Sequence, residues 1–208
     1  EGPGGDLFPA AGRMLRWDGV GGFEDITIRS RLLDVLWVNY SVLDQNKGSF
    51  DPFIQRMDPR FHENGKSVAH GDLNGDGYVD LIGTNSSGTK WAGPPDDTEE
   101  VPGPIFVWMN ERGENHWLTL RLQGRMAIDG TGSNADGIGA RVYLTAKPTG
   151  TGKASVQVKE VTAGSGYLSM SSMDLEFGLG NASLVQQIEI LWPSGRRQVL
   201  TDVPVAQV

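Results

Sequence analysis

The chain has 208 residues, with 18 Lys and Arg against 26 Asp and Glu, and a formal net charge of −8. It contains no cysteine, which excludes disulfides, thiol nucleophiles and cysteine–zinc sites. Because the chain is acidic and has no run of 18 apolar residues, we expect neither a nucleic-acid partner nor a membrane span.

The negative charge is concentrated in the first half of the chain. Residues 1–104 contain 17 acids and 9 bases, whereas residues 105–208 contain 9 of each. This asymmetry predicts two domains, 1–104 and 105–208, with different surface chemistry. Residues 93–104 contain four prolines, which exclude a helix or a central strand and predict an exposed loop at the junction.

An imperfect repeat occurs in the first segment. Residues 33–39 read LDVLWVN and residues 79–85 read VDLIGTN, with an offset of 46 residues. Periods of this length are typical of β-propeller blades, and both copies are predicted to be strands. A propeller needs four to eight blades, but 104 residues supply two at most. We therefore expect an incomplete propeller with unpaired strand edges.

The strongest local motif is the sequence DLNGDGYVD at residues 72–80. Hard cations such as Ca²⁺ take six to eight oxygen ligands, and Gly77 permits the sharp turn that such a loop requires. The ligands expected for one Ca²⁺ are the side chains of Asp72, Asn74, Asp76 and Asp80 and the carbonyl of Tyr78. An EF-hand is excluded because Gly83 stands where its bidentate Glu belongs. The alternative is a turn with solvated carboxylates.

Alternating apolar and polar residues follow in the second segment. They predict short strands at residues 117–122, 140–144, 156–161, 175–177, 188–192 and 198–200. Six strands at this spacing indicate an antiparallel sandwich or small barrel. Asp129, Asn134 and Asp136 form a candidate second cation site in a glycine-rich stretch, with turn geometry as the alternative for Asn134 and Asp136.

The loop at residues 72–80, with Leu81 and Ile82, resembles an FG-GAP/VCBS repeat, the calcium-binding blade unit of integrin-type propellers. Residues 46–50 resemble the turn that ends such a repeat. Five ordered motifs of the second segment resemble the ASPIC/UnbV domain, and they lie at residues 115–118, 133–142, 160–169, 177–180 and 192–195.

Together these motifs are similar to those of cartilage-acidic-protein-like proteins. The resemblance implies an all-β fold, in which partial propeller-like repeats precede an antiparallel β-sandwich. It also implies a secreted, calcium-binding protein without established catalytic residues.

Other site classes find little support in the sequence. No G-x-S-x-G motif is present and the three histidines lack metal-pair spacing, so we expect no enzyme. Trp91 is a candidate sugar-stacking residue. Asn39, Asn85 and Asn181 match the N-glycosylation pattern, at a frequency near chance.

These observations predict a secreted or cell-surface calcium-binding structural or adhesion module. Unpaired strand edges pair with other chains, so we also expect self-association into filaments. Residues 1–11 are a candidate donor segment, with a disordered tail as the alternative. The alternative function is a fragment of a longer receptor-like or carbohydrate-binding repeat protein, with a carbohydrate or an extracellular protein as partner.

Overall fold

The computed structural model describes residues 13–18, 20–32, 64–86, 88–93, 97–101, 105–150 and 153–208. The chain divides into two compact units. The first is Glu1–Val68 with Ile82–Trp108, and the second is Ala69–Leu81 with Met109–Val208. The Asp72–Asp80 loop therefore belongs to the second unit. The predicted domain boundary between residues 104 and 105 marks where the chain would divide into two parts that fold independently. This boundary stays a prediction.

The first described elements form a small hairpin with a short helix. Strand β1 (Leu15–Trp17) pairs antiparallel with β2 (Phe23–Asp25), and α1 (Thr27–Ser30) follows. The carboxylate of Asp25 accepts hydrogen bonds from the Thr27 amide at 3.0 Å and the Thr27 hydroxyl at 2.6 Å. These bonds fix the start of α1, because an Asp before a helix satisfies amides that lack a partner within the helix.

The middle of the chain forms two open sheets. Strands β3 (Asn64–Gly71), β4 (Asp80–Ser86) and β7 (Ile105–Trp108) form a three-stranded sheet in the order β3-β4-β7. Strands β5 (Gly88–Gly93) and β6 (Asp97–Val101) form a two-stranded sheet. The prediction of a loop throughout residues 93–104 is therefore wrong, because Asp97–Val101 form a strand. The prolines flank this strand, so none of them interrupts its hydrogen bonding.

Of the two copies of the 46-residue repeat, the structure describes the second. Residues 80–85 of that copy lie in β4, as the repeat predicts. Residues 33–39, the first copy, lie outside the described residues. The described sheets are open, and none closes into a barrel.

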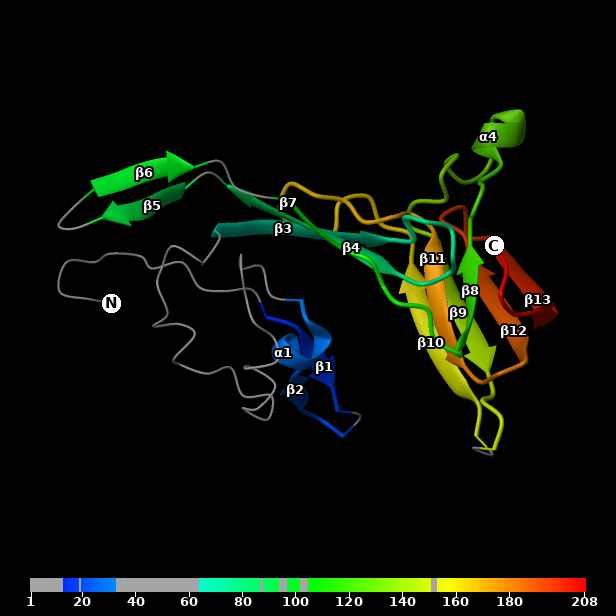
Figure 1. The fold of residues 1–208 in the computed structure, drawn as a ribbon. Coiled ribbons are helices and arrows are strands. Elements are labelled where there is room, and N and C mark those ends of the chain that lie inside the picture. Colours follow the sequence, from blue (N-terminus) through cyan, green and yellow to red (C-terminus); the bar gives the residue numbers. More distant parts are fainter. Residues whose placement is uncertain are drawn as a thin grey trace. The chain divides into compact units, whose positions relative to one another are not determined.

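The second unit contains all six strands that the alternation predicts. They are β8 (His116–Leu120), β9 (Arg141–Ala146), β10 (Ser155–Glu160), β11 (Leu175–Gly180), β12 (Leu184–Leu191) and β13 (Arg197–Pro204). Every described pair is antiparallel. One sheet has the order β10-β9-β12-β13, and β11 pairs with β8 in the other (Figure 1).

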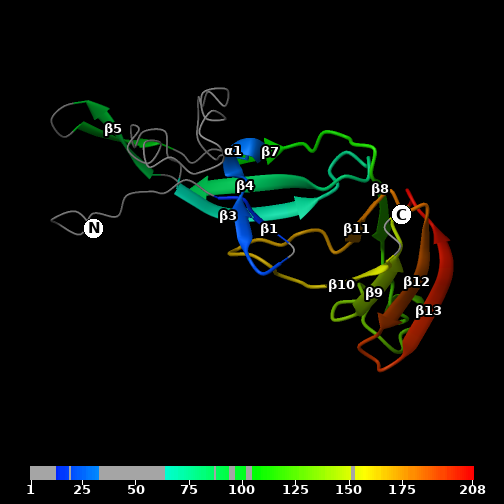
Figure 2. The same ribbon diagram turned by 90° about the horizontal axis from the view of Figure 1, so that it is seen from below.

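Both sheets of the second unit share one hydrophobic core. Leu118 of β8 and Phe177 of β11 are buried together with Leu144 of β9 and Ile188 of β12. Figure 2 shows the β8–β11 pair on one side of the four-stranded sheet. The only described helix of this unit is α4 (Met126–Asp129). The prediction of an all-β fold is confirmed. Among the described residues, no helix is long and apolar enough to cross a membrane.

Candidate metal-binding loop

The Asp72–Asp80 loop connects β3 to β4 and is organised by its first carboxylate. Oδ1 of Asp72 accepts hydrogen bonds from the amides of Gly75 at 2.8 Å and Asp76 at 3.0 Å. Oδ2 accepts another from the Gly77 amide at 2.8 Å. Three successive backbone amides are thus held around one side chain. The sequence reaches this geometry because Gly75 and Gly77 adopt positive φ angles of 73° and 88°.

The next two predicted ligands, Asn74 and Asp76, contact each other. Asn74 Nδ2 donates to Asp76 Oδ2 at 3.0 Å, and the Tyr78 amide donates to Asp76 Oδ1 at 2.9 Å. Arg112 Nε also donates to Asp76 Oδ2, at 3.1 Å. The Tyr78 amide and the Arg112 guanidinium outweigh desolvation and hold the pKa of Asp76 below its ordinary value. Asp76 is therefore a carboxylate anion at neutral pH.

The last predicted ligand, Asp80, ties the loop to another segment of the chain. Asp80 is buried, with 1% of the residue exposed. Oδ2 accepts a hydrogen bond from the Leu73 amide at 2.9 Å, and Oδ1 accepts one from the Asn110 amide at 2.7 Å. Asp80 therefore closes the loop onto its own start and joins it to the residues that precede β8.

The loop packs against β8 through a glycine, and against the residues just before β8 through a tyrosine. A Cβ atom added to Gly77 would lie 1.7 Å from Cε2 of Trp117, so the indole lies directly against this glycine. The Tyr78 hydroxyl lies 2.7 Å from the carbonyl of Gly113 and 2.8 Å from that of Asn115. The candidate site is therefore part of the surface of the second unit.

A buried polar group lies beside the start of the loop. The Ser172 amide donates to the carbonyl of His70 at 2.8 Å, and His70 Nδ1 lies 3.9 Å from Oε2 of Glu176. The Glu176 side chain is 5% exposed. In the described part of the chain, Oε1 of Glu176 and Oγ1 of Thr119 have no hydrogen-bond partner. The two residues are directly opposite each other in the β11–β8 pair.

The chemistry of the loop fits a hard cation. Its side chains offer three carboxylates and one amide oxygen, and carboxylate oxygens that accept one amide hydrogen keep a free lone pair. The guanidinium of Arg112 already supplies a positive charge at Asp76. Across the described ranges, however, no group of three or more His, Asp or Glu side chains is arranged so that it could hold a metal ion. Calcium ligation by this loop stays a prediction.

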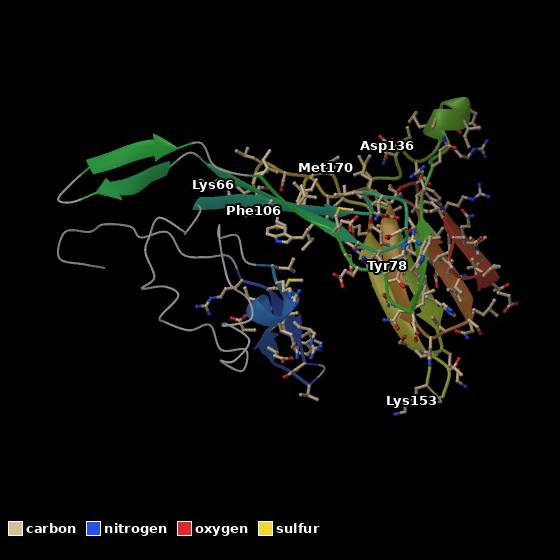
Figure 3. All side chains as sticks on the ribbon, viewed as in Figure 1. Lys66, Tyr78, Phe106, Asp136, Lys153 and Met170 are labelled. Carbon is tan, nitrogen blue, oxygen red and sulfur yellow. The ribbon has the colours of Figure 1, made fainter. Side chains whose placement is uncertain are left out.

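The candidate second cation site has its polar groups in separate turns. Asp129 pairs with Arg125 and accepts hydrogen bonds from Thr131. Mainly through the Thr131 hydroxyl and then Arg125, the pKa of Asp129 falls to about 2. Asn134 Nδ2 donates to the carbonyl of Ile138 at 2.7 Å, and Asn134 Oδ1 accepts a hydrogen bond from the Ile138 amide at 2.8 Å. Asp136 lies near α4, away from Tyr78 (Figure 3).

The remaining predicted sites are only partly within the described structure. Trp91 lies in β5 and Asn85 in β4, but their side chains are outside the described residues, as is all of Asn39. Asn181 is exposed, and its Nδ2 donates to the carbonyl of Thr149 at 3.2 Å. Sugar binding and glycosylation stay predictions.

Sequence reasoning missed three residues that contact the loop: Asn110, Arg112 and Trp117. Asn110 and Arg112 lie 30 or more residues from the acids that they contact. No spacing relates them to the loop motif. Trp117 lies in a strand pattern that predicts burial, but the pattern does not identify Gly77 as the residue that packs against its indole.

Comparisons with known proteins match both segments of the chain. The FG-GAP repeat matches residues 64–100, and the family described as ASPIC and UnbV matches residues 130–208. Cartilage acidic protein 1 of Xenopus tropicalis is 28% identical over 151 residues, which cover 70% of this chain. The chain spans 20% of that relative's length. No solved structure matches. One segment of the chain therefore matches the FG-GAP repeat and another matches the ASPIC and UnbV family, as the sequence motifs predicted.

Proposed function

We propose that the chain is a non-enzymatic, calcium-binding structural or adhesion module of an extracellular repeat protein. The observation that carries this proposal is the Asp72–Asp80 loop, which concentrates oxygen ligands in the segment that matches the FG-GAP repeat. FG-GAP repeats often bind calcium. The oxygen-only ligand set is also the kind that Ca²⁺ prefers over softer metals.

The chain's own residues define how a cation would be held. Asp72, Asn74 and Asp76 supply side-chain oxygens, and Tyr78 supplies its carbonyl. Asp80 is buried and holds Leu73 and Asn110, so it fixes the frame of the loop. Bound calcium supplies positive charge that offsets the repulsion between neighbouring carboxylates.

The packing of the loop supports a structural role. Gly77 lies against Trp117, and Tyr78 is bonded to the carbonyls of Gly113 and Asn115. A cation that orders this loop also fixes the surface of β8 on which the loop rests. Calcium therefore stabilises the second unit in this proposal, through binding to the folded form only.

The extracellular location rests on the relative. It is named as an acidic protein of cartilage, a tissue that consists largely of secreted matrix, and the present chain also has a net charge of −8. Since this chain spans a fifth of that relative, no partner is carried over from it.

The proposal is tested by melting the full chain in calcium, in magnesium and in EDTA, together with calorimetric calcium titration. Extracellular modules bind Ca²⁺ with Kd on the order of 10⁻⁴ to 10⁻³ M. A tenfold excess over Kd then adds about 1.4 kcal/mol to the free energy of unfolding. Asp76→Asn should abolish the calcium-dependent shift in Tm. Asp136→Asn, which removes one acid from the other candidate site, should retain it. A wild-type melt that is insensitive to EDTA would contradict the proposal.

Self-association is a second proposal, favoured by the open sheets. Among the described strands, β10 and β13 are the edges of the four-stranded sheet, and Val156 and Val158 of β10 are 59% and 52% exposed. Exposed apolar edges pair readily with other chains. Sedimentation and electron microscopy of the full chain, with and without residues 1–11, test this proposal. A chain that stays monomeric at high concentration would refute it.

A further inference from the structure

A positively charged side chain reaches into the candidate calcium loop from outside its sequence. Arg112 lies between β7 and β8, and its Nε donates to Oδ2 of Asp76 at 3.1 Å. The Asp76 side chain is 4% exposed, whereas the Arg112 side chain is 71% exposed. Most of the arginine therefore lies in solvent, and its Nε contacts a carboxylate that solvent hardly reaches.

The backbone around Arg112 is held to the loop on both sides. The Asn110 amide donates to Asp80 Oδ1 at 2.7 Å, and Asn110 Nδ2 donates to the carbonyl of Val79 at 3.1 Å. Beyond Arg112, the carbonyls of Gly113 and Asn115 lie within hydrogen-bonding distance of the Tyr78 hydroxyl. Residues 110–115 therefore place the arginine over Asp76 without depending on the ion pair itself.

A guanidinium and a metal ion make opposing demands on the same carboxylate. Each is a cation, and Asp76 Oδ2 already accepts hydrogen bonds from Arg112 and from Asn74. Calcium affinity rises with the net negative charge of the ligand set. An arginine beside one ligand reduces this charge and also repels a divalent ion at short range.

We infer that Arg112 is an internal cation that balances the charge of Asp76 in the calcium-free loop and lowers the calcium affinity of the site. This inference rests on the proposed function, because it assigns a regulator to the same loop. Arg112 thereby sets the calcium concentration at which the loop fills, and it keeps the calcium-free loop folded against β8.

The test compares charge-removing and charge-keeping variants of the full chain. Arg112→Gln removes the charge but keeps a hydrogen-bond donor, and Arg112→Lys keeps the charge. Arg121→Gln is the matched control, because the Arg121 side chain is 73% exposed and pairs with Asp174, outside the loop. Calcium Kd is measured by calorimetry at low and high salt, and Tm is measured in EDTA.

The expected result is a Kd about tenfold tighter for Arg112→Gln at low salt, with a smaller gain at high salt. The same variant should melt at a lower temperature than the wild type in EDTA. Arg112→Lys should stay near the wild-type Kd, and so should Arg121→Gln.

If the wild type and Arg112→Gln bind calcium with equal Kd, the inference is overturned and the proposed function stands. If neither binds calcium, both are overturned. Circular dichroism of each variant shows whether it is folded, and a misfolded Arg112→Gln would leave Arg112→Ala to decide by the same Kd criterion.

Discussion

Gly77→Ala is expected to destabilise the second unit more than any other single-methyl change in the loop. Its Cβ would lie 1.7 Å from Cε2 and 2.2 Å from both Cζ2 and Nε1 of Trp117. Relieving this overlap moves a large side chain of β8, and overpacking of this kind costs about 1–3 kcal/mol. The φ angle of +88° adds roughly 1–2 kcal/mol for a residue with a Cβ. The expected total loss in the free energy of unfolding is about 2–5 kcal/mol.

Gly75→Ala is the matched control for this prediction. Gly75 has a φ angle of +73°, but nothing lies within 4 Å of an added Cβ. It should therefore lose only the conformational part, roughly 1–2 kcal/mol. Urea unfolding of both variants, followed by circular dichroism and tryptophan fluorescence, measures the difference. Trp117→Leu should shrink this difference by removing the indole. Equal losses for the two glycine variants would refute the packing of the loop on Trp117.

Three further predictions concern the same unit. Tyr78→Phe should lower the free energy of unfolding in urea by about 0.5–1.5 kcal/mol, because the Tyr78 hydroxyl is bonded to the carbonyls of Gly113 and Asn115. Tyr167→Phe is the control and should change it little, because Tyr167 is 67% exposed. Thr119→Val should preserve or raise stability, because its buried hydroxyl has no partner among the described residues. A loss above about 1 kcal/mol would reveal an undetected partner. Asp129→Asn should lower Tm at neutral pH. The pKa of Asp129 is about 2 in the folded chain against 3.8, so its contribution is complete above about pH 4 and is lost as pH falls to 2. A Tm difference that stays constant from pH 7 to pH 2 would show that the carboxylate does not act through ionisation.

The strands of the second unit could be predicted because side-chain alternation is a local property. In β9, the buried residues Val142, Leu144 and Ala146 alternate with more exposed ones, and each is also a residue that favours burial. The ligand pattern of the Asp72–Asp80 loop is equally local, since its five predicted ligands fall within nine residues. One compact loop therefore contains all five of them, and their convergence on a cation stays a prediction.

Contacts between distant segments could not be predicted in the same way. Trp117 alternates with the buried Leu118, but alternation does not show that Gly77 covers the outward face. Arg112 and Asn110 carry no motif, and their role depends on where the chain returns after β7. In β6, the high proline content of residues 93–104 led to the wrong prediction of a loop. The prolines fall outside Asp97–Val101, and this strand pairs on one edge only, with β5.

The central claim is that calcium binds the Asp72–Asp80 loop and thereby stabilises the unit on which the loop is packed. Hydrogen–deuterium exchange of the full chain, with calcium and with EDTA, tests both parts in one measurement. We expect slower exchange with calcium in peptides that cover residues 72–80, and also in those that cover residues 110–117, because Asp80, Tyr78 and Gly77 join the two segments. Peptides that cover Asp129 and Asp136 should not change. Identical exchange of residues 72–80 in calcium and in EDTA would contradict the claim.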